Sequence, residues 1–253
     1  MAERRTKDMS DASDRKNRLL LVVDSDVDNL SYTSTLLKRF DYQTSTAGTA
    51  KEAFQIAAVS VPSLIIISLN LKDMHGLDLM RELKKNPSTA AVPFIALRRS
   101  GDLLGERQSL ELGAVDCFYH PVSAERLYQA VQAATETRPR PCIRLRTTQL
   151  VKIEDMLFDG IEGASTLDLS ERGMFLRTAE PAVVNTRLSL HLDLNGHPIP
   201  VESVVIYSYR TAGGPYLQPG MGLEFVRISP RDQALIRQFV KTEVTRGITP
   251  GQA

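Results

Sequence analysis

Two short groups of polar residues in the second half of the sequence have side chains suited to holding an anionic ligand. Arg140 and Arg144 form the pattern RxxxR, and Asp168, Ser170 and Gly173 form the pattern DxSxxG. A guanidinium can donate two parallel hydrogen bonds to phosphate oxygens or to the O6 and N7 edge of guanine, and an aspartate accepts from N–H donors. A serine hydroxyl can contact phosphate or brace a loop, and a glycine permits a tight turn. Side chains of these types could hold an anionic ligand such as a phosphate.

A second set of polar residues directly follows the apolar runs of the first half. These residues are Asp24, Ser25, Ser68, Arg98 and His120. A doubly wound parallel sheet places its chemistry at the carboxyl ends of the strands, so these positions form the candidate site of the first half. Taken singly, each has an ordinary explanation, such as a phosphoserine site, a solvated arginine or a structural histidine.

Length and composition limit the classes of protein to which the chain can belong. Its 253 residues correspond to about 1.7 domains of typical size. The net charge of +1 provides no basic field for non-specific nucleic-acid binding. The two cysteines, Cys117 and Cys142, have no metal-ligand or disulfide spacing, which fits a reducing cytoplasm. Residues 1–17 are polar and predict a disordered tail, and no run resembles a signal peptide or a membrane span.

From residue 18, short apolar runs alternate with helical patterns, which predicts parallel strands joined by helical crossovers. Several of the runs are apolar at almost every position, as strands covered on both faces must be. The expected strands are Leu19–Val23, Tyr42–Thr46, Ser63–Ser68, Pro93–Leu97 and Val115–Phe118. The expected helices are Asp28–Phe40, Ala50–Ser60, Leu77–Lys85, Leu103–Leu112 and Ser123–Ala134, with Thr49 and Ser123 as N-caps. The pattern predicts a doubly wound α/β domain with a five-stranded parallel sheet over residues 18–135.

Residues 136–147 have the composition of a linker. Pro139 and Pro141 forbid a continuous helix, and the stretch from Arg138 to Arg146, both included, contains four arginines. Short alternating segments then predict a small antiparallel β-barrel over residues 148–245, followed by a tail at 246–253. The expected strands are Gln149–Glu154, Gly163–Asp168, Gly173–Thr178, Arg187–Leu194, Ile199–Tyr209 and Met221–Phe225. Expected turns lie at Asp159-Gly160, Asn195-Gly196 and Gly213-Gly214-Pro215, and a final helix over Pro230–Thr242 would bury Ala234, Leu235, Phe239 and Val240.

The first half resembles the response-regulator receiver family over about residues 18–135. The match rests on the acidic loop at Asp24-Ser25-Asp26, the strand 63–68, the loop 73–76, the strand 93–97 and the segment 113–121 that ends in His120-Pro121. The resemblance implies a flavodoxin-like fold, a proline at 121 that is commonly cis, and a surface for partners over residues 103–134.

Four family positions differ in this sequence from what phosphorylation requires. Ser68 stands at the phosphoacceptor aspartate, and Ser25 stands at the second residue of the acidic pair, so only Asp24 of that pair remains. Arg98 replaces the switch hydroxyl and His120 replaces the phosphate-pairing lysine. A serine offers neither the carboxylate for an acyl phosphate nor a charge for magnesium, so we expect a receiver domain that cannot be phosphorylated. Asp73 is a further carboxylate on the loop beyond the acceptor strand, but we do not expect it to substitute for the acceptor.

The second half resembles the PilZ family over about residues 138–242. Its ligand motifs, RxxxR and [D/N]xSxxG, match Arg140 to Arg144 and Asp168 to Gly173, and the segment 220–225 matches its last strand. The resemblance implies binding of cyclic di-GMP through Arg140, Arg144, Asp168, Ser170 and Gly173. The alternatives are solubilising charge in the linker and an ordinary side-chain-capped turn.

The sequence thus predicts a bacterial, cytoplasmic signalling adaptor with no enzymatic activity, metal or cofactor. Cyclic di-GMP is its expected ligand, and an unidentified protein would dock on the 103–134 surface. The main alternative is an interaction scaffold that binds no nucleotide. A DNA-binding regulator would require a recognition helix, and the sequence has no helix-turn-helix or basic recognition helix.

Overall fold

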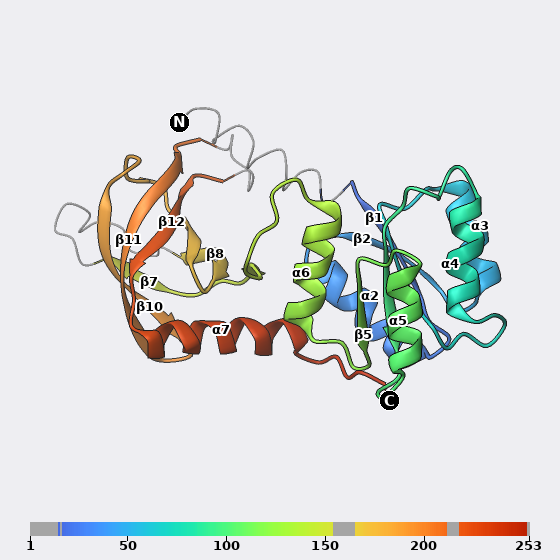
Figure 1. Ribbon diagram of the computed structural model, residues 1–253. Coiled ribbons are helices and arrows are strands. Elements are labelled where there is room, and N and C mark those ends of the chain that lie inside the picture. The colour runs from blue at the N-terminus through green and yellow to red at the C-terminus, as the bar shows by residue number, and fades with distance from the viewer. Residues whose placement is uncertain (1–14, 16, 154–164, 212–217, 252–253) are drawn as a thin grey trace. The chain divides into compact units, whose positions relative to one another are not determined.

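The computed structural model describes residues 15, 17–153, 165–211 and 218–251. The chain divides into two compact units (Figure 1). One comprises residues 14–141 together with 245–253, and we call it the α/β unit. The other comprises the described residues between 142 and 244, and we call it the β unit. Residues 246–251, from the segment 246–253 that the sequence predicted as a tail, belong to the α/β unit, where the guanidinium of Arg39 donates to the carbonyl of Arg246 at 2.8 Å.

The α/β unit is built on a five-stranded parallel sheet, as the sequence predicted. Its strands are β1 (Leu19–Val23), β2 (Gln43–Ala47), β3 (Leu64–Ser68), β4 (Phe94–Arg98) and β5 (Asp116–Tyr119), in the spatial order β2-β1-β3-β4-β5. All four neighbouring pairs are parallel. Every residue of β3 and β4 is buried, which explains why their sequences are almost uniformly apolar.

Five helices cover the two faces of this sheet. They are α2 (Val27–Arg39), α3 (Ala50–Val59), α4 (Gly76–Lys85), α5 (Leu103–Glu111) and α6 (Ala124–Thr135). Alternate sheet residues such as Leu21 and Ile65 pack with α3 and α4 in one apolar core. On α2 and α6, the rings of Phe40 and Tyr128 meet edge to face, with centroids 5.0 Å apart. Thr49 caps α3 by accepting from the amide of Glu52, whereas Ser123 occupies the N-cap of α6 without a side-chain bond.

The β unit is a curled antiparallel sheet, a half-barrel. Its strands are β6 (Leu145–Arg146), β7 (Val151–Ile153), β8 (Ser165–Ser170), β9 (Gly173–Arg177), β10 (Arg187–Leu194), β11 (His197–Tyr209) and β12 (Gly220–Arg227), in the order β6-β8-β9-β12-β11-β10-β7. Because β6 and β7 follow each other in the chain but lie at opposite edges, the segment 145–153 connects the two ends of the curled sheet.

One of the predicted turns can be compared with the structure. Asn195 and Gly196 both have positive φ, 55° and 84°, and join β10 to β11 in a two-residue hairpin of the type that Asn-Gly favours. The predicted turns at 159–160 and 213–215 lie outside the described residues. Strand β6 was not predicted, since two residues inside the arginine-rich segment carry no alternating pattern.

The final helix, α7 (Pro230–Thr245), buries a different stripe from the one predicted. Its buried residues are Ile236, Val240 and Val244, which recur every fourth residue. Leu235 is 44% exposed and Ala234 is also exposed, so the prediction was wrong for these two side chains. Within the described residues, no helix combines the length and the apolar content needed to cross a bilayer.

Candidate functional site

The five polar positions of the α/β unit meet at the carboxyl edge of its sheet. Asp24 follows β1, Ser68 ends β3, Arg98 ends β4 and His120 follows β5. Asp24 and His120 are both buried, and the His120 Nε2 lies 3.2 Å from the Asp24 Oδ2. The other oxygen of Asp24 accepts from the amide of Asp26 at 3.0 Å. The single matching acidic residue is thus engaged by a histidine and by its own loop.

Ser25 and Asp26 complete the acidic loop and are also engaged within the protein. The Ser25 hydroxyl donates to the carbonyl of Gly48 at 2.7 Å and accepts from the amide of Lys72 at 3.0 Å. Asp26 accepts from the amide of Asn29 at 2.9 Å and so caps α2. Ser25 therefore ties the ends of β1 and β2 to the loop after β3, and Asp26 serves as a helix cap.

Arg98, which stands at the position of the family's switch hydroxyl, forms an ion pair. Its Nη2 lies 2.5 Å from Glu106 on α5, and its guanidinium lies 5.7 Å from the ring centroid of Tyr119. The following His120–Pro121 peptide bond is cis, as the sequence led us to expect. Arg98 thus connects β4 to α5 and β5.

Asp73, the carboxylate on the loop beyond β3, does not point to the strand ends. Its two oxygens accept from the amides of Ala50 and Lys51, at 3.0 and 3.2 Å, at the start of α3. Hydrogen bonds from these amides, led by that of Ala50, lower the pKa of Asp73 despite a small opposing effect of burial. Its charge is therefore used to stabilise a helix N-terminus.

The RxxxR motif is divided between the two units. Arg140 belongs to the α/β unit, where its amide donates to the Gln132 Oε1 at 2.9 Å. Arg144 belongs to the β unit and immediately precedes β6. Between them, the thiol of Cys142 donates to the carboxylate of Glu171 at 3.1 Å.

The DxSxxG motif forms the β8–β9 hairpin of the β unit. Asp168 lies on β8 directly opposite Arg146 of β6, so β6 carries the end of the arginine segment to the second motif. Ser170 pairs with Gly173, and its hydroxyl donates to the Gly173 carbonyl at 2.9 Å, which braces the two-residue turn. Ser170 was expected either to contact phosphate or to brace the loop. The bond to Gly173 is of the second kind.

The structure explains the glycine at position 173 differently from the sequence-based prediction of a tight turn. Its φ is not in the left-handed region, so the turn does not demand glycine for its backbone angle. A Cβ at this position would collide with the carbonyl oxygen of Leu223 on β12. The close approach of the neighbouring strand, rather than a strained turn, therefore requires glycine here.

Glu171 is the residue of this site that sequence reasoning missed. Besides holding Cys142, its carboxylate forms a close ion pair with the guanidinium of Arg237 on α7, and its backbone carbonyl accepts from Gln233 at 3.3 Å. Partial burial raises the pKa of Glu171, but the hydrogen bonds from Arg237 and Cys142 outweigh it and leave the pKa lowered. Glu171 and Cys142 occupy variable positions of the two motifs, and nothing in the local sequence marks Arg237 as their neighbour.

Strand registers also place an aromatic pair near Asp168. Asp168 is opposite Phe175 of β9, Phe175 is opposite Gly222 of β12, and Gly222 is opposite Tyr207 of β11. The rings of Phe175 and Tyr207 stack with centroids 6.1 Å apart, and the space for Tyr207 exists because Gly222 has no side chain. Phe175 is buried and Tyr207 is half-buried, so the pair packs the sheet beside the second motif.

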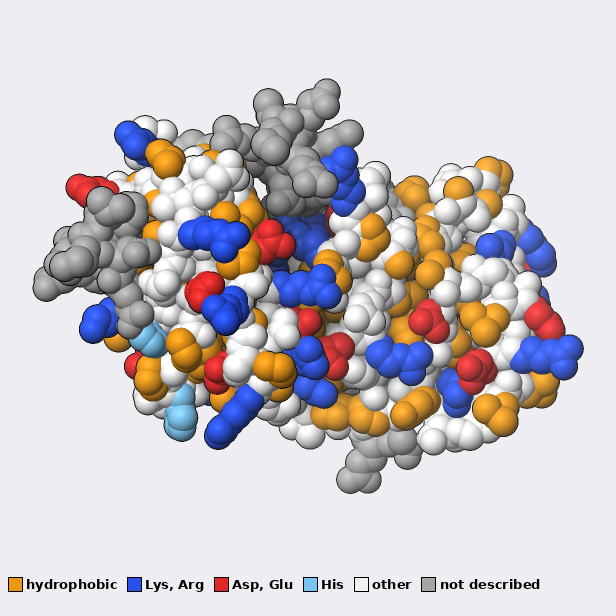
Figure 2. Space-filling model, turned by 60° about the vertical axis from the view of Figure 1, so that its left-hand side comes forward, with side chains coloured by type: hydrophobic (Ala, Val, Ile, Leu, Met, Phe, Trp, Pro, Cys, Tyr) orange, Lys and Arg blue, Asp and Glu red, His pale blue; other side chains and the backbone are white. Residues whose placement is uncertain are grey.

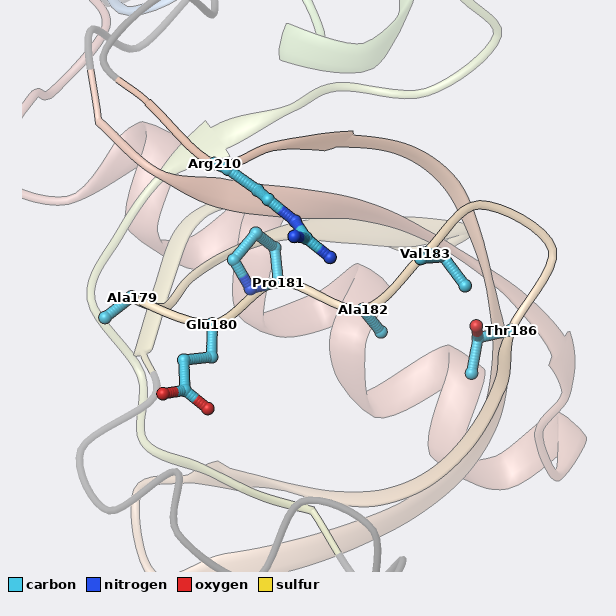
Figure 3. A pocket seen from close by; sticks show the side chains of 7 residues that line it. All are labelled: Ala179, Glu180, Pro181, Ala182, Val183, Thr186 and Arg210. Carbon is cyan, nitrogen blue, oxygen red and sulfur yellow. The ribbon is translucent and has the colours of Figure 1, made fainter.

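A pocket of about 480 Å³ lies elsewhere on the β unit, beside the β9–β10 connection (Figure 3). Its lining comes from residues between Ala179 and Thr186 and from Arg210, whose guanidinium extends over Pro181. None of the motif residues lines it, so it is not the site that the motifs predict. Among the residues that the structure describes, no three histidine, cysteine or acidic side chains come together as a metal site.

Figure 2 shows basic side chains interspersed with acidic ones over the coloured part of the face it draws. This distribution agrees with the net charge of +1. It gives a polyanion such as DNA no extended basic surface on that face.

The fold defines a protein of two domains, a receiver-type α/β domain and an antiparallel half-barrel. Family comparison gives the particular families. Residues 20–132 match the response regulator receiver domain, and residues 136–242 match the PilZ domain. The chain therefore carries a response regulator receiver domain followed by a PilZ domain.

Individual relatives agree with the receiver assignment. The chain is 28% identical over 135 residues to a probable cyclic di-GMP phosphodiesterase of Vibrio cholerae, covering 53% of this chain and 30% of that protein. It is 31% identical over 119 residues to the response regulator PleD of Caulobacter vibrioides, covering 46% and 26%. The crystal structure of the NtrX receiver domain from Brucella abortus is 27% identical, with a TM-score of 0.45, and covers 47% of this chain and 99% of that one. The chain spans about a third or less of the two curated relatives.

Proposed function

We propose that this protein is a signalling adaptor that binds cyclic di-GMP through its PilZ domain and relays binding to a protein partner. The observation that carries the proposal is that the chain just after Arg140 runs beside the second motif on the β unit. Cys142, between the two arginines, bonds to Glu171 inside the second motif, and Arg146 faces Asp168 across β6 and β8. A ligand that contacts one motif is then within reach of the other.

The proposed roles follow from the chemistry of each side chain. Arg140 and Arg144 bind the phosphates or the O6 and N7 edge of guanine. Each of these groups offers two acceptor atoms side by side, which a guanidinium can contact with two parallel hydrogen bonds. Asp168 accepts from the guanine N1 and N2 donors. Ser170 and Gly173 shape the hairpin that carries Asp168, with Ser170 also able to reach phosphate.

The relay uses the division of RxxxR between the two units. A ligand held by both Arg140 and Arg144 constrains the segment that joins the units, so binding changes their preferred arrangement. The partner docks on the 103–134 surface, where Leu103, Leu104 and Tyr119 are at least half exposed. Apolar side chains gathered on a helix and an adjacent strand are typical of a protein-binding surface.

The receiver domain acts in this proposal without phosphorylation. Ser68 provides no carboxylate, Asp24 is engaged by His120, and Asp26 caps a helix. The chain acts as a cytoplasmic binding protein and not as an enzyme. The catalytic activity named for the Vibrio relative belongs to a protein of which this chain covers only 30%.

Titration calorimetry of the full chain with cyclic di-GMP tests the proposal. We expect binding by the wild-type protein and a loss of about 10- to 100-fold in affinity for Arg144→Ala, because a hydrogen bond to a charged group contributes about 1.5–3 kcal/mol. Arg138→Ala, in the same linker but outside the motif, is the control and should bind as wild type does. Equal affinities for all three proteins, or no binding at all, would contradict the proposal.

Small-angle scattering with and without the ligand tests the relay separately. Binding that leaves the scattering profile unchanged would remove the reorientation while leaving ligand recognition intact. The alternative function, an interaction scaffold without nucleotide binding, is supported by the exposed apolar side chains of α5 and β5 alone. It predicts partner binding that cyclic di-GMP does not alter.

A further inference from the structure

The α/β unit contains a buried polar network at the end of α6, far along the chain from the acidic loop. At its centre is Glu136, whose side chain is completely buried. Arg15 Nε lies 3.1 Å from one carboxylate oxygen, and Arg18 Nη1 lies 3.1 Å from the other. The phenol of Tyr42 donates to the same carboxylate at 2.9 Å. A buried carboxylate requires such compensation, because losing its hydration without partners costs several kcal/mol.

Arg15 lies within the N-terminal segment that the sequence predicted as a disordered tail. It is instead 4% exposed and bonded to Gln132 of α6 and to Glu136, the C-cap of that helix. Its second contact, from Nη2 to the Gln132 Oε1 at 3.1 Å, extends the network from Glu136 to Gln132.

Gln132 connects this network to the first arginine of RxxxR. Its side-chain oxygen accepts from Arg15 and from the amide of Arg140, and its side-chain nitrogen donates to the Tyr42 hydroxyl at 2.7 Å. A flipped amide would place N–H groups against two donors, so only one orientation of Gln132 satisfies all three contacts. The amide is therefore fixed before it meets Arg140.

The backbone on either side of Arg140 has little freedom of its own. Pro139 and Pro141 flank it, and each proline fixes its own φ and restricts the residue before it. The bond from the Arg140 amide to Gln132 therefore helps to fix the backbone at Arg140. The nearest contact on the other side is that of Cys142 with Glu171, which holds the β-unit end of the motif.

We propose that Gln132, a residue of the receiver domain, is a positioning residue for cyclic di-GMP binding. It holds the backbone of Arg140 in place, so the ligand does not have to order this part of the motif when it binds. Preorganisation of this kind raises affinity by reducing the entropy lost on binding. The inference rests on the proposed function, and it makes the receiver domain a contributor to the PilZ ligand site.

Two substitutions in the full-length protein separate positioning from general stability. Gln132→Met removes the acceptor for the Arg140 amide with a side chain of similar length. Tyr42→Phe removes the phenol that both Gln132 and Glu136 use, but it leaves the acceptor for Arg140 in place. Both disturb the same buried network, so a purely structural effect would weaken the two variants alike. Gln129→Met, an exposed position on the same helix, controls for the new side chain.

Calorimetric titration with cyclic di-GMP should show about a three- to tenfold loss of affinity for Gln132→Met, the effect of one net hydrogen bond. Tyr42→Phe and Gln129→Met should stay within twofold of wild type. Hydrogen exchange of the Arg140 amide, measured without ligand, should be faster in Gln132→Met than in Tyr42→Phe.

Wild-type affinity in Gln132→Met, or an equal loss in Tyr42→Phe, would overturn the inference. If no protein binds the nucleotide, the proposed function fails. Hydrogen exchange still decides the anchoring in that case, since an Arg140 amide that exchanges equally slowly in Gln132→Met would refute it directly.

Discussion

At the carboxyl edge of the parallel sheet, the polar side chains are engaged by other groups of the protein. Asp24 meets His120, Ser25 bridges Gly48 and Lys72, and Arg98 pairs with Glu106. The residues at this edge therefore stabilise one arrangement of the loops.

We expect that this receiver domain does not accept a phosphoryl group from acetyl phosphate with Mg²⁺. Ser68 lacks the carboxylate that forms an acyl phosphate, and the Ser68→Asp variant should remain unmodified as well, because Ser25 and His120 still replace a metal ligand and the phosphate-pairing lysine. Intact-mass spectrometry at neutral pH measures the modification. An unrelated receiver domain with the full set of acidic residues is the positive control, and an added phosphoryl mass on the wild-type chain would refute the expectation.

Cys142 provides a pH-dependent report on the contact between the two motifs. Burial, followed by the hydrogen bond and charge of Glu171, raises the pKa of its thiol from 9.0 to about 11. Because the thiolate is the reactive form, alkylation of Cys142 below pH 9 should be about 100-fold slower than for a thiol of unshifted pKa. The favourable effect of the protonated thiol on folding is complete below pH 9 and is lost as the pH rises through about 11.

Peptide-resolved mass spectrometry of alkylation between pH 8 and 11 measures this profile. Glu171→Gln removes the negative charge and should move the profile of Cys142 to lower pH, while Cys117, buried in the other unit, should keep its own profile. A midpoint near 9.0 for the wild-type thiol would show that neither the burial of Cys142 nor its contact with Glu171 persists in solution.

At the scale of elements, the final helix of the β unit provides a matched pair of core and surface positions. Ile236 is completely buried on α7, whereas its neighbour Leu235 is 44% exposed. Ile236→Ala should lower the free energy of unfolding of the β unit by about 2–5 kcal/mol through lost apolar contact and a cavity. Leu235→Ala should change it by less than about 1 kcal/mol, since surface substitutions have small effects. Urea unfolding followed by circular dichroism measures the free energy of unfolding of the two variants. Equal losses of stability would contradict the assignment of Ile236, and not Leu235, to the buried face of α7.

The elements themselves could be predicted from sequence to different extents, for physical reasons. Strands β1 and β3 were found because burial on both faces makes them apolar throughout. Strand β6 escaped because two residues cannot show a period, and the stripe of α7 was displaced by one residue because Leu235 and Ile236 are equally apolar. The reason for Gly173 could not be found either, since the collision it avoids involves Leu223 of a strand distant in sequence.

The ligand site shows the same limit. The motif residues Arg140, Arg144 and Asp168 carry recognisable chemistry and spacing, so the sequence alone identifies them. The contacts that hold the motifs, Gln132 with Arg140 and Glu171 with Cys142, join residues 8 and 29 positions apart. Neither contact follows a helix or strand period, so no local pattern predicts it.

At the scale of the whole molecule, the proposed roles of Arg140 and Arg144 predict that the stabilities of the two units depend on a common ligand, because the two arginines belong to different units. A ligand that binds only the folded state stabilises that state by about 2.7 kcal/mol at a concentration 100 times its Kd. If Arg140 and Arg144 both hold cyclic di-GMP, unfolding either unit releases part of the binding energy. Scanning calorimetry should therefore show that the ligand raises the unfolding temperatures of both units.

The assignment of the two transitions comes from substitutions confined to one unit. Ile236→Ala should lower only the β-unit transition, and Leu36→Ala, in the core of the α/β unit, should lower only the other. In Arg140→Ala, the ligand should still raise the β-unit transition, by less than in wild type, and should no longer raise the α/β transition, because Arg140 is the motif residue that belongs to that unit. The contrary result is that cyclic di-GMP raises the unfolding temperature of the β unit alone in the wild-type protein. That result would mean that the ligand binds but does not stabilise the receiver domain, so the proposed relay would have no thermodynamic basis.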